Sequence, residues 1–171
     1  MKYVKIFLAS SVVEFEKERR ELGDYIRSLN DIYVKRGIYF ELNLCEDLSN
    51  AIDKERKQEQ YNRIIRDSQY FYILFGKNAG EYTIEEFDVA LKQFRSSGEP
   101  KLYTYFMQLP DGQSAEKTVQ DFMVRLDKEI GHYYSMFSHL DSVKLNMIVE
   151  LARDPTLHST VKFDSGQATL D

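Results

Sequence analysis

Short apolar runs alternate along the chain with longer segments of helical periodicity. Five runs have the length and composition of strands, at residues 3–9, 38–44, 70–75, 102–107 and 133–137. The run at 70–75 is apolar at every position, which is typical of a central strand that is covered on both faces. The pattern therefore predicts five strands, with the third of them inside a sheet.

A helix is expected after each strand. In the first helical segment, the apolar positions that share one face are Phe15, Leu22, Ile26, Leu29 and Tyr33. Further helices are expected at 51–67, 83–97, 114–130 and 141–153. Alternating strands and helices joined by short connections predict an α/β fold with helices on both faces of the sheet. We expect the flavodoxin-like, doubly wound, five-stranded parallel sheet.

The last part of the chain has a different pattern. Pro155 ends the final predicted helix, and two short strands are expected around Asp164, Ser165 and Gly166. The pattern predicts one domain over residues 1–155. Residues 156–171 are interpreted as a C-terminal stub or linker toward a missing domain.

Composition limits the classes of function. The 171 residues include 23 Lys and Arg and 28 Asp and Glu, a net charge of −5, which disfavours a generic nucleic-acid binder. The single cysteine, Cys45, cannot form an internal disulfide, which favours a reducing compartment, and we expect a cytoplasmic protein. No apolar run approaches the roughly 18 residues needed to span a membrane, so no membrane partner is expected. The three histidines lack metal-ligand spacing, and no metal is expected.

Polar residues follow the first two strands, at the edge of the sheet where such folds bind ligands. Ser10 and Ser11 can offer hydroxyl and N–H groups to a phosphate, or they can simply cap a helix, since Ser11-x-x-Glu14 fits a capping box. Asp47 can bind ribose hydroxyls, or it can lie in a solvated loop. No glycine-rich dinucleotide motif or P-loop motif occurs.

Glu86 is the main candidate for catalysis. It lies early in a predicted helix, at the edge of the apolar face, whereas Glu85 is expected to point into solvent. A carboxylate against apolar packing is partly desolvated, as functional carboxylates often are. The structural alternative is a capping box, Thr83-x-x-Glu86, with Tyr82 and Phe87 as a hydrophobic staple around it. Both interpretations are open at this point.

Three segments together resemble prokaryotic TIR-like domains. They are K-I-F-L-A-S-S at residues 5–11, E-R-R-E-L at 18–22, and Y-F-Y-I-L-F-G-K-x-x-G-x-Y-T-x-E-E-F at 70–87. The resemblance extends from Lys2 to Met107, and residues 76–90 are its most specific part. It implies the same flavodoxin-like architecture.

Many TIR domains cleave NAD at the nicotinamide–ribose bond with one glutamate. An aromatic residue often stands four positions before that glutamate, and Tyr82 and Glu86 match this spacing, although the family often has Trp there. The resemblance implies that Glu86 is catalytic and that Tyr82 stacks on the substrate. Ser10, Ser11 and Asp47 are expected to bind the substrate because they follow strands at the ligand-binding edge. The resemblance also assigns residues 45–50 to a loop that often gates the site and mediates assembly.

The function expected from this resemblance is an NAD glycohydrolase or cyclase, with NAD as substrate and no cofactor. The chain would be the effector module of a bacterial antiphage immune protein, self-associating through TIR–TIR contacts and joined to a sensor domain in the same full-length chain. One alternative is a non-catalytic self-association or adaptor module. Another is a nucleoside 2-deoxyribosyltransferase-like enzyme. The sequence does not separate hydrolysis of NAD from cyclisation.

Overall fold

The computed structural model describes residues 1–44, 57–157, 161–164 and 167–170. The chain divides into two compact units, Met1–Met136 and Phe137–Asp171. The predicted boundary at residue 155 between a domain and a stub remains a prediction.

Five strands form one sheet in the order β2-β1-β3-β4-β5. Their bounds are β1 Lys2–Ser10, β2 Ile38–Asn43, β3 Tyr70–Phe75, β4 Lys101–Met107 and β5 Tyr134–Phe137. The pairs β1–β2, β1–β3 and β3–β4 are parallel, and Ile6 of β1 lies opposite Tyr70 of β3. Every residue of β3 is buried, as the unbroken apolar run predicted. The prediction of a five-stranded, flavodoxin-like α/β fold is confirmed.

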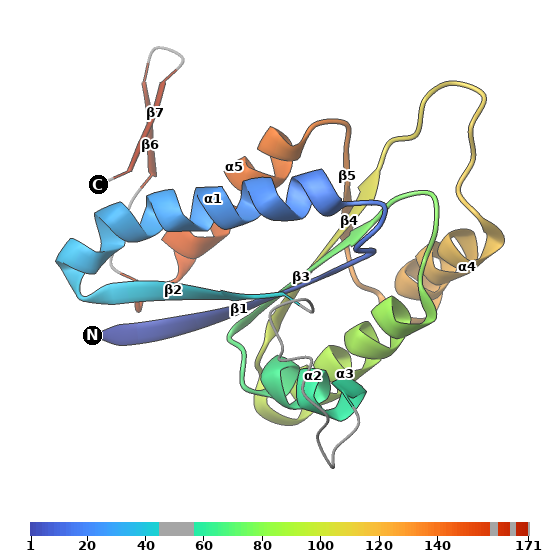
Figure 1. Ribbon diagram of the computed structural model, residues 1–171, viewed down its shortest axis with the longest axis horizontal. Coiled ribbons are helices and arrows are strands. Elements are labelled where there is room, and N and C mark those ends of the chain that lie inside the picture. The colour runs from blue at the N-terminus through green and yellow to red at the C-terminus, as the bar shows by residue number, and fades with distance from the viewer. Residues whose placement is uncertain (45–56, 158–160, 165–166, 171) are drawn as a thin grey trace. The chain divides into compact units, whose positions relative to one another are not determined.

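The helices of the first unit cover both faces of this sheet. They are α1 Glu16–Tyr33, α2 Lys57–Arg66, α3 Glu81–Ser97 and α4 Lys117–Arg125. Figure 1 shows α1 on one side of the sheet and α2, α3 and α4 on the other. The 3-10 helix η1 (Val34–Arg36) follows α1, and the π-helix η3 (Leu126–Ile130) follows α4.

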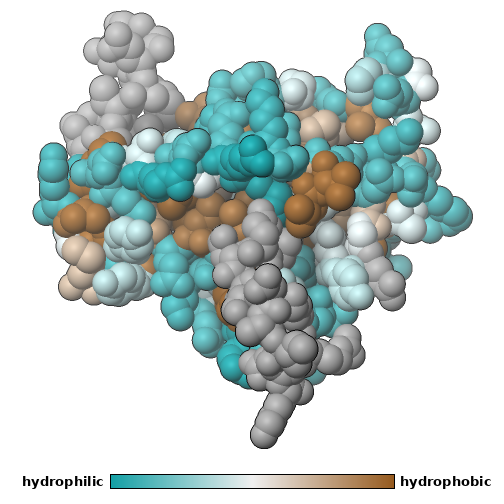
Figure 2. All heavy atoms as spheres, viewed as in Figure 1, coloured by the Kyte–Doolittle hydropathy of each residue, from teal (hydrophilic) through white to brown (hydrophobic). Residues whose placement is uncertain are grey.

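The face under α1 has both apolar and polar contacts. Leu22, Ile26, Leu29 and Tyr33 of α1 are buried, in agreement with the predicted apolar stripe. Asn30 is also buried, and its side chain exchanges two hydrogen bonds with the backbone of Phe40, which ties α1 to β2. In Figure 2 a hydrophilic band lies where α1 runs in Figure 1, as expected for the outer face of an amphipathic helix.

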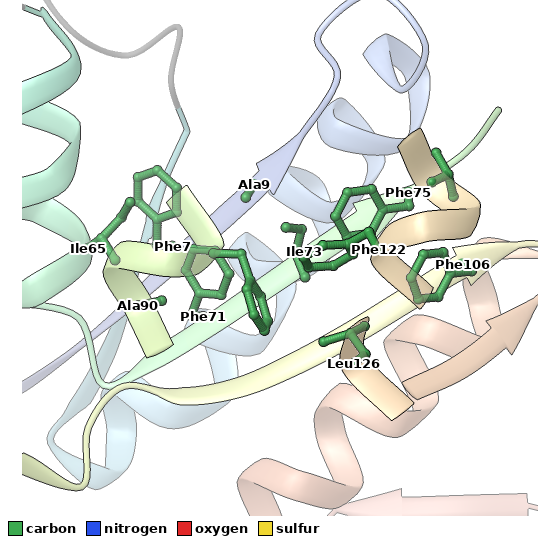
Figure 3. Close-up of a cluster of buried hydrophobic side chains, with 12 residues drawn as sticks. Phe7, Ala9, Ile65, Phe71, Ile73, Phe75, Ala90, Phe106, Phe122 and Leu126 are labelled. Atoms are coloured by element: carbon green, nitrogen blue, oxygen red, sulfur yellow. The ribbon is translucent and has the colours of Figure 1, made fainter. Parts of the chain in front are cut away.

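The opposite face contains the main aromatic core. Figure 3 shows side chains from the strands, including Phe7, Phe71 and Phe75, together with Ile65 of α2 and Phe122 of α4. The rings of Phe75 and Phe122 lie 4.8 Å apart between centroids. Most of the aromatic residues in β3 and β4 therefore belong to packing and not to a ligand surface.

The second unit contains α5 Leu140–Arg153 and the antiparallel strands β6 Val161–Asp164 and β7 Gln167–Leu170. Leu140, Val143, Met147 and Leu151 form the buried face of α5. The two short strands agree with the sequence pattern. In the described part of the chain, no helix combines the length and apolar character needed to cross a membrane.

Candidate active site

The order of the strands places the expected ligand-binding position between the carboxyl ends of β1 and β3. From β1 the chain passes to β2 on one side of it and then to β3 on the other, so the loops after β1 and β3 diverge at the carboxyl edge of the sheet. Sheets of this kind bind ligands at that point. Ser10 is the last residue of β1, and α3 begins at Glu81 shortly after β3 ends.

Glu86 lies on α3 close to this edge and is buried, with 6% of its surface exposed. The predicted capping box is wrong, because α3 begins at Glu81 with Gly80 as its N-cap and no side chain caps it. The backbone N–H of Thr83 instead donates to the carbonyl of Gly80. Glu86 therefore lies in the second turn of the helix and is not needed to cap it.

The surroundings of Glu86 disfavour its charged form. Burial raises its pKa to about 7, the nearby charge of Glu85 adds to this effect, and the guanidinium of Arg19 opposes it. Glu86 is therefore close to half ionised at neutral pH. Such a carboxyl group can act as a base or a negative charge when it is ionised and as a proton donor when it is protonated.

Arg19 is a buried residue at the candidate site that the sequence pattern did not single out. It lies at the start of α1, is only 1% exposed, and donates from Nη1 to the hydroxyl of Ser10 at 2.8 Å and to the carbonyl of Ser10 at 3.3 Å. A sequence signal was present, because Arg19 stands four positions after Phe15 and three before Leu22, on the apolar stripe of α1. A charged residue on such a stripe must be paired when it is buried.

Ser10 and Ser11 have different environments. The Ser10 side chain is buried and accepts from Arg19, so it holds the arginine in place at the end of β1. The Ser11 hydroxyl accepts a hydrogen bond from the backbone N–H of Glu14 at 3.2 Å. This bond matches one half of the predicted capping box, but α1 begins only at Glu16. The role of either serine in binding substrate remains a prediction.

Glu14 was interpreted as a capping residue, and the structure gives its carboxylate another position. The carboxylate accepts hydrogen bonds from the backbone N–H groups of Lys77 and Asn78, the latter at 3.3 Å. A Cβ atom on Gly76 would lie closer to this carboxylate than a nonbonded contact allows. Glu14 therefore bridges the loops that follow β1 and β3, and it needs a glycine at position 76 to do so.

Tyr82 is 62% exposed in the first turn of α3. It precedes Glu86 by four positions, so the two residues are neighbours on the helix surface. An exposed aromatic ring beside a buried carboxylate is consistent with a stacking role. Asp47 and the loop at residues 45–50 lie outside the described residues.

Glu85 does not point into solvent as expected. It is half buried, and its Oε1 accepts from the Nδ2 of Asn62 on α2 at 3.4 Å. Asn62 in turn accepts from Gln58 at 3.3 Å, and both of these amides are buried. The contact between α2 and α3 therefore holds a second carboxylate near Glu86, which explains why Glu85 raises the pKa of Glu86.

Comparisons with known proteins support the fold. No protein-family model matches the sequence, and no curated protein matches it. Among solved structures, the CMP N-glycosidase BcmB of Clostridium botulinum is similar, with a TM-score of 0.50 and 12% identity, over 85% of this chain and 98% of that chain. At this identity the likeness concerns the fold alone. The chain shares an α/β fold with a protein that is named as a nucleotide N-glycosidase.

Proposed function

We propose that the protein is an N-glycosidase that cleaves the bond between the ribose and the base of a nucleotide, with Glu86 as its catalytic carboxylate. The observation that supports this most directly is the buried carboxyl group of Glu86, which interacts electrostatically with the buried Arg19 near the carboxyl edge of β1 and β3. The fold shared with a CMP N-glycosidase and the spacing of Tyr82 and Glu86 agree with it.

The reaction needs stabilisation of positive charge on the ribose. As the bond from C1′ to the base nitrogen breaks, its electron pair leaves with the base and positive charge develops at C1′. An ionised Glu86 next to C1′ stabilises this charge, and its low-dielectric surroundings strengthen the effect. The oxygen of a water molecule then bonds to C1′, and the proton it releases passes to solvent or to the departing base.

Within this class, NAD is the substrate that we propose. Its pyridinium leaves as neutral nicotinamide, so no acid has to protonate the leaving group, and one ionised carboxylate is sufficient. The resemblance to TIR-like domains supports this choice, and with it a cytoplasmic effector module in bacterial antiphage immunity that self-associates and is joined to a sensor domain. If water is replaced by another nucleophile within NAD, the product is cyclic.

A nucleoside monophosphate is the second candidate substrate, because the similar structure is named for CMP. The two candidates are separated by incubating the protein with NAD, with CMP and the other nucleoside monophosphates, and with a deoxynucleoside plus a free base. Chromatography and mass spectrometry then identify the released base and the sugar product. Base exchange without action on NAD would favour the deoxyribosyltransferase-like alternative.

The test of the mechanism compares Glu86→Gln with Glu85→Gln at high protein concentration, which favours assembly. We expect E86Q to lose at least about 100-fold in turnover, because charge stabilisation of this kind contributes about 3 kcal/mol or more. The matched variant E85Q should remain active. Wild-type turnover should rise with pH through about 7 as Glu86 ionises. Equal turnover by E86Q and the wild type would refute the assignment of Glu86.

A further inference from the structure

A pocket of about 400 Å³, which Glu86 does not line, lies between α3 and the segment that follows α4. One wall consists of the side chains on α3 that recur at helical spacing, Phe87, Leu91, Phe94 and Arg95. The other wall is formed by Ile130, Gly131 and His132, and residues 101–103 at the start of β4 complete the lining. The volume is in the range of small-molecule sites.

The walls of this pocket are mainly apolar along its length. Phe87 is fully buried, whereas Leu91, Leu102 and Ile130 are half buried and Phe94 is 43% exposed. The interior end of the pocket, at Phe87, is therefore the more enclosed, and the other end opens to solvent. Ile130 ends the π-helix η3, and π-helical turns occur frequently at functional sites.

Two cationic residues lie at the open end. Arg95 is in the last turn of α3, and Lys101 is the first residue of β4, so both lie at the amino edge of the sheet. Two positive charges beside an apolar pocket are distinctive in a chain of net charge −5. Burial lowers the pKa of His132, so this residue is neutral and the positive charge comes from Arg95 and Lys101.

We propose that this pocket binds a small monocarboxylate with an apolar body. The carboxylate lies between Arg95 and Lys101, and the apolar body extends along Leu91 toward Phe87. The positive charges of Arg95 and Lys101 favour an anionic ligand. The apolar walls disfavour an anion with a polar body, such as a sugar phosphate. Glu86 does not line this pocket and lies nearer the opposite, carboxyl edge of the sheet.

The experiment uses octanoate as the probe and octan-1-ol as an uncharged probe with the same tail. Amide signals of the protein are followed by NMR while each probe is added. Octanoate should cause saturable shifts at Leu91, Phe94, Leu102 and Gly131. Octan-1-ol should bind at least about 10-fold more weakly, because it lacks the charge-assisted hydrogen bonds.

Variants then test whether Arg95 and Lys101 bind the carboxylate. The double variant Arg95→Gln with Lys101→Gln should bind octanoate about as weakly as octan-1-ol. Lys92→Gln is the matched control, because Lys92 is exposed on the same helix and does not line the pocket, and it should bind as the wild type does. These residues are all exposed, so the variants should fold, which circular dichroism verifies.

Three results would overturn the proposal. The first is the absence of saturable shifts with octanoate. The second is equal affinity for octanoate and octan-1-ol. The third is a dimer formed through the pocket, seen as a sedimentation coefficient that rises with protein concentration in the wild type but not in Leu91→Glu. Because each measurement detects binding or assembly, it is independent of whether the protein cleaves nucleotides.

Discussion

Glu86 binds its proton more tightly in the folded chain than in the unfolded chain. Its pKa is about 7 when folded, against an ordinary value of 4.5. Between these values the folded state holds a proton that the unfolded state has released, so the free energy of unfolding falls as pH rises. The stabilising contribution of protonated Glu86 is complete below pH 4.5 and is lost as pH rises through about 7.

Glutamine at position 86 does not titrate, so the free energy of unfolding of Glu86→Gln should not show this fall with rising pH. Relative to the wild type, E86Q should gain about 3 kcal/mol in the free energy of unfolding as pH rises through this window. Urea denaturation at a series of pH values measures the difference. A constant difference between the two proteins at all pH values would show that Glu86 is not shifted.

Arg19 should control the ionisation of Glu86. Its positive charge lowers the pKa of Glu86 against the effect of burial, so Arg19→Met should raise that pKa further and Arg19→Lys should raise it less. The ¹³C signal of the Glu86 carboxyl group, followed through a pH titration, reports this value without any substrate. Glu85→Gln should shift the titration in the opposite direction, to lower pH. An unchanged titration in R19M would exclude the electrostatic role of Arg19.

The sequence indicated Glu86 as the catalytic candidate, which stays a prediction, but it did not indicate the environment of this residue. The spacing from Tyr82 and the position at the edge of an apolar face both indicated Glu86. A pKa, however, depends on which groups come close in three dimensions, and Arg19 comes from another helix. The position of Arg19 on the apolar stripe of α1 was a visible signal that it would be buried.

At the scale of the elements, the side chain of Glu14 holds the loop after β1 against the loop after β3. The Glu14 carboxylate accepts from the N–H groups of Lys77 and Asn78, and this contact requires the absence of a Cβ at Gly76. The loops after β1 and β3, which flank the candidate site, therefore have a fixed spacing. The residue at position 76 therefore affects the spacing of the loops beside the candidate site, because the absence of a Cβ atom leaves room for the Glu14 carboxylate.

The variants Glu14→Gln and Gly76→Ala should both weaken this bridge. E14Q removes the charge from two hydrogen bonds and should cost about 1–2 kcal/mol of stability. G76A should displace the carboxylate and cost a similar amount. Because both changes break the same contact, the double variant should cost clearly less than the two single costs together.

Denaturation of the four proteins gives this double-mutant cycle. Glu16→Gln is the control, since Glu16 forms an exposed ion pair with Arg20 and should contribute less than about 1 kcal/mol. Additive costs for E14Q and G76A would mean that the two positions act independently. The prediction of a shared contact would then be wrong.

Helix boundaries were the weaker part of the sequence analysis at this scale. The predicted helix at 83–97 begins at Glu81 in the structure, because Gly80 serves as the N-cap and Thr83 is already inside the first turn. Both Thr83-x-x-Glu86 and Ser11-x-x-Glu14 match the capping-box pattern, yet neither begins its helix. A four-residue pattern does not indicate tertiary interactions. Glu86 is instead buried and influenced by the charge of Arg19, and Glu14 binds the loop after β3.

At the scale of the whole molecule, the aromatic core is the main buried cluster of the first unit, and we expect it to contribute strongly to stability. Phe122 of α4 contacts Phe75 of β3 and Phe87 of α3, with ring centroids 4.8 Å and 5.0 Å away. Phe122→Ala should therefore lower the free energy of unfolding by about 3–5 kcal/mol. Val124→Ala on the same helix is the control, because Val124 is 51% exposed and should change stability by no more than about 0.5 kcal/mol.

Urea denaturation tests this prediction, and similar midpoints for F122A and V124A would contradict it.

The fold as a whole was predictable because it depends on a repeated signal, five apolar runs alternating with helical periodicity. The electrostatics of the site were less predictable because they depend on single contacts between distant residues. The pocket beside α3 gave no sequence signal, since its lining residues have the ordinary spacing of a core-facing helix.

The buried Arg19 has a consequence for how the chain folds. Arg19 of α1 and Glu86 of α3 are both buried and interact electrostatically, so neither has its native charge environment until both helices have docked on the sheet. Docking of α1 and docking of α3 should therefore form a single cooperative step. Hydrogen exchange under native conditions should show the amides of these two helices opening together, although they lie on opposite faces of the sheet.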